Sequence, residues 1–154
     1  MNGLWVYSSC VNSSSGRKAV DLMALLHAAA AAQAEVEAKL GTLGLSLPKL
    51  MALKALSDAG ESMPLGQLAE RLSCVKSNIT QLVDRLEADG FVARAADPTD
   101  RRSRLAVLTA AGRKACAEGA RVQQETEREL LTALTKDESR QLAALLEKVG
   151  RRSG

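Results

Sequence analysis

Two groups of polar side chains in this chain have the types and spacing to contact a polyanion. Between Lys76 and Asp89, apolar residues recur at the spacing of one helix face: Ile79, Leu82, Val83 and Leu86. With that face inward, at about 100° per residue, the outer face presents short polar groups flanked by cations: Lys76, Ser77, Thr80, Gln81, Asp84 and Arg85. Such groups can approach base edges, while the cations can contact phosphates.

The second group lies on a predicted β-hairpin, formed by strand-like runs at residues 91–96 and 104–109 around a turn-rich tip. This hairpin carries four arginines against two aspartates: Arg94, Arg101, Arg102, Arg104, Asp97 and Asp100. A hairpin is narrow enough to reach into a groove of a duplex. Helix and hairpin together therefore favour DNA binding.

Two observations compete with this interpretation. Every amphipathic helix has a polar outer face, and by itself such a face is simply solvated; only its combination with the basic hairpin favours DNA. Asp84 would repel phosphate unless it accepts a hydrogen bond from a cytosine amine or pairs with an arginine. We expect it to pair with a hairpin arginine, within the chain or across a dimer.

The elements that position these groups follow from local signals. Helical patterns are predicted from Arg17 to Leu40, from Ser46 to Gly60, from Gly66 to Leu72, from Thr109 to about Leu134, and after the capping box that begins at Thr135. A short Met63–Pro64 segment and a tight turn at Ser73–Cys74 complete a winged helix-turn-helix. The fold class is mainly α with a small β-wing. We divide the chain into a disordered arm (1–16), a dimerisation helix (17–45), the winged helix-turn-helix (46–109) and C-terminal dimerisation helices (110–154).

Composition bounds the class of protein. The chain has 154 residues, of which 46% are hydrophobic and 25% charged, with a formal net charge of +3. These values fit one compact domain and exclude a large multidomain enzyme. The charge permits a polyanionic partner without requiring one. The longest uncharged apolar stretch, Leu22–Ala34, is too short for a membrane span.

The sequence holds none of the common catalytic motifs. There is no GxxxxGK[ST], GxGxxG, HExxH or GxSxG, and there is one histidine, His27. The three cysteines (Cys10, Cys74 and Cys116) are far apart and form no CxxC pair, so no sequence-local zinc site exists. We expect a cytoplasmic protein that is not an enzyme and uses no metal or cofactor.

Several segments closely resemble the MarR family of bacterial transcriptional regulators: Leu68–Leu72, Asn78–Val92, Asp97–Arg102 and Leu108–Gly112. The resemblance covers roughly Leu45 to Gly112. It implies a homodimer in which the first helix and the last two interlock and hold two winged lobes over a pseudo-palindromic operator. Successive major grooves on one face of DNA lie about 34 Å apart.

The resemblance also assigns roles. Residues Lys76 to Asp89, including Asn78, correspond to the recognition helix, and Arg102, with Arg101 beside it, to the arginine that enters the minor groove. Asp97 and Asp100 are expected to shape the wing. Arg94 matches a basic position at the wing base, for which a phosphate contact and a salt bridge to Asp97 or Asp100 are both open.

The chain departs from the family pattern at Ser73-Cys74-Val75, where valine cannot cap the next helix and the cap moves to Ser73. Cys74 is then either a reactive thiol at a helix N-terminus or a small hydrophobe in the turn. Cys10 is a second candidate redox thiol, whereas Cys116 is expected to be a packing residue.

The predicted function is a regulator, a repressor rather than an activator, that a small-molecule or oxidant signal releases from DNA. Because the family's effector cleft borders the first helix, Met23 and His27 are the candidate effector residues. The alternative is a winged-helix scaffold used only for protein association.

Overall fold

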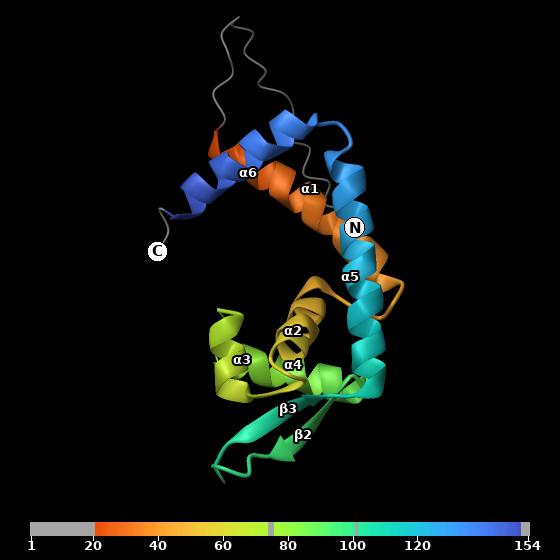
Figure 1. Cartoon of the computed structure of the whole chain (residues 1–154), viewed down its shortest axis with the longest axis vertical. Coiled ribbons are helices and arrows are strands. Elements are labelled where there is room, and N and C mark those ends of the chain that lie inside the picture. The colour runs from red at the N-terminus through yellow and green to blue at the C-terminus, as the bar shows by residue number, and fades with distance from the viewer. Residues whose placement is uncertain (1–20, 74–75, 101, 152–154) are drawn as a thin grey trace, which may run out of the picture.

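The computed structural model describes residues 21–73, 76–100 and 102–151 (Figure 1). Its elements are α1 (Leu22–Gly41), α2 (Leu47–Asp58), β1 (Ser62–Pro64), α3 (Leu65–Arg71), α4 (Lys76–Ala88), β2 (Val92–Ala96), β3 (Arg104–Leu108), α5 (Ala110–Leu131) and α6 (Lys136–Gly150). The predicted fold class is confirmed: the chain is mainly helical, with a winged helix-turn-helix between flanking helices. The arm expected at residues 1–16 lies outside the described residues.

The winged lobe is built around a three-stranded antiparallel sheet with the order β1-β3-β2. β2 and β3 form the hairpin, in which Val92 pairs with Leu108 and Ala96 with Arg104. One apolar core joins the sheet to the helices; its fully buried side chains include Leu50, Leu53, Leu56, Leu68, Val83, Leu86 and Ala106. The apolar stripe predicted for α4 faces this core, so its polar side faces outward.

Local capping signals set the helix ends. Ser46 Oγ accepts from Lys49 N–H, Thr109 caps α5, and Thr135 and Glu138 form the predicted capping box of α6. The helix expected from Arg17 instead begins at Leu22, because the carboxylate of Asp21 accepts from Ala24 N–H at 2.7 Å and caps it there.

The predicted end of α5 also differs from the structure. This helix stops at Leu131 rather than near Leu134. The N–H of Leu134 turns back to the carbonyl of Leu131 at 3.0 Å, which frees Thr135 to cap α6.

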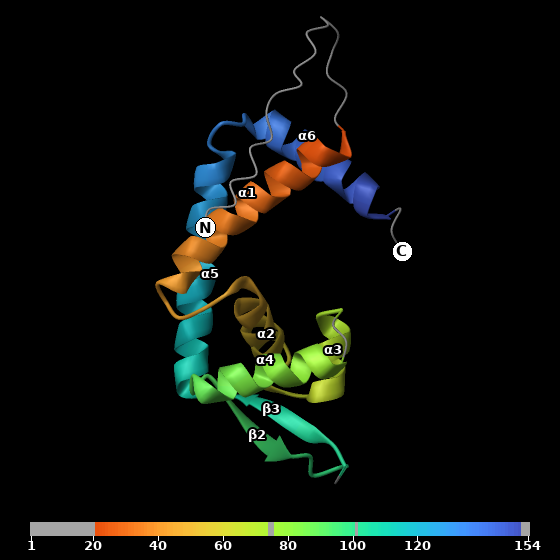
Figure 2. The same ribbon diagram turned by 180° about the vertical axis from the view of Figure 1, so that it is seen from behind.

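Helix α5 connects two parts of the molecule. In Figures 1 and 2 it runs from the hairpin at one end to the crossing of α1 and α6 at the other. It packs on α2 within the winged lobe and on α1 beyond it. α5 is therefore in contact both with the winged lobe and with α1.

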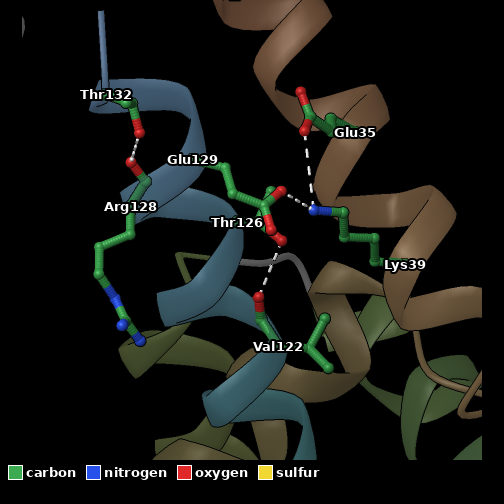
Figure 3. A network of polar contacts seen from close by, with 7 residues as sticks. All are labelled: Glu35, Lys39, Val122, Thr126, Arg128, Glu129 and Thr132. Atoms are coloured by element: carbon green, nitrogen blue, oxygen red, sulfur yellow. Dashed lines mark hydrogen bonds and ion pairs between the residues drawn. The ribbon is translucent and has the colours of Figure 1, made fainter. Parts of the chain in front are cut away.

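A polar network fixes α1 against α5 (Figure 3). The ammonium of Lys39 pairs with Glu129 of α5 and with Glu35 of α1, the latter at 3.8 Å. The hydrogen bond with Glu129 raises the pKa of Lys39. Below this contact, the hydroxyl of the buried Thr126 donates to the carbonyl of Val122 at 2.8 Å, so its burial leaves no polar atom unpaired.

Helix α6 packs differently from the other helices. It has no buried residue in the single chain. Its predicted apolar stripe is exposed to solvent, together with the first turns of α1: Leu22, Met23, Leu26, Leu142, Leu145, Leu146 and Val149. None of the helices within the described ranges is long and apolar enough to cross a membrane.

The joint between the hairpin and α5 requires glycine at position 112. A Cβ there would lie 2.0 Å from the carbonyl oxygen of Phe91 and 2.9 Å from Leu108 Cδ1. The side chain of Thr109 holds the same joint: it donates to the carbonyl of Gly90 at 2.7 Å and accepts from Gly112 N–H at 3.0 Å.

We expect Gly112→Ala to lower the free energy of unfolding by about 1–3 kcal/mol or more, because backbone must move to admit the methyl group. Urea denaturation at fixed chain concentration measures the change. Gly66→Ala is the matched control, since a Cβ at this position of α3 would have nothing within 4 Å and alanine favours helix. Equal stability of the Gly112→Ala variant and the wild type would show that this joint is not tightly packed.

Candidate nucleic-acid interface

The exposed polar side of α4 has two stripes. Asn78, Gln81 and Arg85 lie along one flank and, with Pro48 at the start of α2, line a shallow groove of about 300 Å³. Thr80, Asp84 and Glu87 lie along the other flank, which faces the hairpin, where Arg94 meets the two carboxylates. In both views α4 lies beside the hairpin (Figures 1 and 2). Helix and wing thus form one continuous surface.

Arg94 joins these two parts. From β2 its guanidinium pairs with Asp84 Oδ1 at 2.5 Å and with Glu87 Oε2 at 2.6 Å. The hydrogen bond with Asp84, followed by the charges of both carboxylates, raises the pKa of Arg94. Asp84 therefore has the arginine partner expected for it, within the same chain. The salt bridge considered for Arg94 had the wrong partners, because its side chain reaches α4 rather than Asp97 or Asp100.

Ion pairs neutralise the carboxylates of residues 76–89. Asp89, just beyond the end of α4, pairs with Lys49 of α2 at 2.7 Å. All three carboxylates of residues 76–89 thus have a cation partner. Within the described residues, no carboxylate is paired with the side chains of Arg85, Arg102 or Arg104. The surface therefore keeps uncompensated positive charge on α4 and on the wing.

The two wing aspartates accept hydrogen bonds from neighbouring residues of the tip and form no ion pair with an arginine of the described residues. Asp97 Oδ1 accepts from the N–H and the hydroxyl of Thr99, at 2.9 and 2.6 Å, and these bonds lower the pKa of Asp97. Asp100 Oδ1 accepts from Arg102 N–H at 2.9 Å. These bonds shape the tip and do not involve the guanidinium of Arg102.

The other candidates are placed as follows. Lys76 and Ser77 form the first turn of α4, but their side chains are not described, and Arg101, Cys10 and Cys74 lie outside the described residues. Met23 and His27 are exposed on α1, away from the winged lobe. Cys116 is buried, and burial raises the pKa of its thiol. Among the described residues, no group of histidine, cysteine, aspartate and glutamate side chains could hold a metal ion.

Sequence reasoning missed two residues of this surface. Glu87 shares the clamp on Arg94, which its spacing of three residues from Asp84 could have indicated. Arg104 contributes to the predicted charge of the hairpin but has no predicted role, because no local pattern separates it from its neighbours.

Comparison with known proteins agrees with this geometry. The sequence model of the MarR family matches residues 45–103. The HTH-type transcriptional repressor Rv2887 of Mycobacterium tuberculosis is 34% identical over 116 residues, which cover 75% of this chain and 83% of that protein. The transcriptional activatory protein BadR of Rhodopseudomonas palustris is 42% identical over 72 residues, which cover 46% of this chain and 41% of BadR.

The structural comparison extends the match to the flanking helices. A crystal structure of a mutant MarR from E. coli complexed with operator DNA aligns with a TM-score of 0.75 and 28% identity. The alignment covers 83% of this chain and 92% of the MarR chain. A winged lobe with charged wing and polar recognition helix, together with these sequence and structural matches, shows that the chain belongs to the MarR family of winged-helix transcriptional regulators.

Proposed function

We propose that this regulator binds a pseudo-palindromic DNA operator as a homodimer, acts as a repressor, and is released by a small-molecule or oxidant signal. The observation that carries the proposal is the sorting of charge on one surface: the carboxylates of residues 76–89 are paired, whereas Arg85 and Arg102 have no carboxylate partner among the described residues. The names of the relatives support it, since MarR was crystallised with operator DNA and Rv2887 is a repressor.

In the proposed complex, α4 lies in the major groove. Gln81 and Asn78 present amide groups, which can pair with adenine edges, and Arg85 can meet a guanine or a phosphate. Lys76, Ser77 and Thr80 belong to the same helix and complete the proposed contact set. Arg102 enters the flanking minor groove from the wing tip, with Arg101 beside it.

The dimer follows from the exposed apolar surface of α1 and α6. Leu22 is 68% exposed, Leu145 57% and Val149 54%, and they line an apolar groove of about 570 Å³ between the two helices. A soluble chain rarely leaves such a contiguous apolar surface in water. A second copy would cover it and hold the two recognition helices at a fixed separation, about 34 Å for successive major grooves.

Release requires a signal that changes this separation. Because α5 spans from the α1–α6 layer to the winged lobe, a ligand bound beside that layer can shift the lobes. Met23 and His27 on α1 are the proposed effector residues. A coupling of about 1–3 kcal/mol would give a usable switch. For the oxidant form of the signal, Cys10 and Cys74 are the proposed thiols.

We expect Leu145→Glu to produce a monomer, because a charge on the apolar stripe opposes burial against a second copy. Analytical ultracentrifugation at several concentrations measures the oligomeric state. Met51→Glu is the matched control: Met51 is 51% exposed but lies on α2, outside this stripe, so the variant should remain dimeric. A monomeric wild-type chain would overturn the dimer proposal.

DNA binding is tested by selecting duplexes from a random pool with the wild-type chain and measuring affinity for the selected site. Arg102→Ala should weaken binding to most sequences, whereas Gln81→Ala should change the preference among sites, since a good base contact contributes roughly 1–3 kcal/mol. If no duplex is preferred over bulk competitor, the chain is not an operator-binding protein. If both variants retain wild-type affinity and preference, the reading surface is misplaced.

A further inference from the structure

The wing and the recognition helix enclose a second groove, separate from the one that Asn78, Gln81 and Arg85 line. It holds about 280 Å³ and is lined by three segments: Leu65 and Gly66 at the start of α3, Ile79 and Thr80 of α4, and Arg102, Ser103 and Arg104 of the wing. None of these described lining residues carries a carboxylate. The volume is smaller than the roughly 300–1,000 Å³ of typical small-molecule sites, but it is ample for a phosphate group.

The wing arginines are not equivalent around this groove. Arg94 is held by Asp84 and Glu87 and is only 27% exposed at its side chain. Arg102 lies on the tip side of the groove. Arg104, the first residue of β3, is exposed, lines the groove, and has no carboxylate partner within the described part of the chain. Arg104 is therefore an uncompensated cation at the junction of wing and helix.

The geometry of B-form DNA determines what must pass over this junction. A single sugar–phosphate strand separates a major groove from the adjacent minor groove. If α4 occupies the major groove and the wing tip the minor groove beside it, that strand must cross the surface between them. This surface is the groove that Arg104 lines, and each phosphate of the strand carries one negative charge.

We propose that this groove binds one phosphodiester of the DNA backbone, the one between the major groove read by α4 and the minor groove entered by the wing, with Arg104 as its cation. The inference rests on the proposed operator binding. It assigns Arg104 a contact that is independent of base sequence and that fixes how deeply helix and wing enter their grooves.

The first test is the salt dependence of binding to the duplex selected by the wild-type chain. Each neutralised phosphate contributes about 0.9 to the magnitude of the slope of log K against log salt concentration. A dimer of the Arg104→Gln variant loses two phosphate contacts, one per subunit, so its slope should be shallower by about 1.8. Arg104→Lys should keep the wild-type slope. Arg140→Gln on α6 is the control for net charge, because its side chain is 77% exposed and remote from the wing.

The second test locates the phosphate. Duplexes that carry one uncharged methylphosphonate at a time are titrated with the wild type and with Arg104→Gln. One position between the major-groove half-site and the flanking minor groove should weaken wild-type binding, and the same substitution should cost the variant nothing further. Such non-additivity identifies a direct pair.

The outcomes separate this inference from the function it rests on. If the wild type prefers no duplex, operator binding fails. If the wild type binds its site but Arg104→Gln keeps the wild-type slope, or retains the full methylphosphonate penalty at every position, the phosphate assignment is wrong. Unchanged thermal unfolding of the variant, expected for an exposed residue, ensures that a loss of affinity does not reflect misfolding.

Discussion

The ion pairs of Arg94 with Asp84 and Glu87 are the interaction on which the candidate DNA-binding surface depends. The guanidinium nitrogens of Arg94 lie 2.5 and 2.6 Å from the carboxylate oxygens of Asp84 and Glu87. These contacts hold β2 against α4, so that the hairpin and the helix form one surface. They also neutralise two carboxylates that would otherwise repel phosphate. Surface ion pairs contribute little stability when isolated, but a guanidinium shared between two carboxylates fixes orientation. One arginine thus governs both the shape and the charge of the surface.

The rest of the molecule places that surface in space. Gly112 and Thr109 join the hairpin to α5 with almost no free volume, since a Cβ at position 112 would overlap the carbonyl of Phe91. Farther along α5, Glu129 pairs with Lys39 of α1. α5 is thus anchored at both places. The apolar stripe of α6, beyond this contact, is exposed to solvent in the single chain.

Helix caps and the spacing of apolar residues, both visible in the sequence, predict most of the architecture. Ser46, Thr109 and Thr135 cap the helices that follow them, and the period of Ile79, Val83 and Leu86 set the inward face of α4. Capping and amphipathic spacing depend on neighbours within a few residues, so they can be read without the fold. The start of α1 was misjudged because the carboxylate of Asp21 accepts from Ala24 N–H and caps the helix there.

The partners of charged side chains were decided only by the tertiary structure. Arg94, Arg102 and Arg104 lie within one short basic segment and have the same side chain. Arg94 forms ion pairs with two carboxylates of α4, whereas the other two have no carboxylate partner among the described residues. Ion pairing depends on which strand lies beside which helix and at what register, and those contacts join residues distant in sequence. The sequence determined that the segment is basic and that it forms a wing. The packing of β2 against α4 determined which of these cations has carboxylate partners.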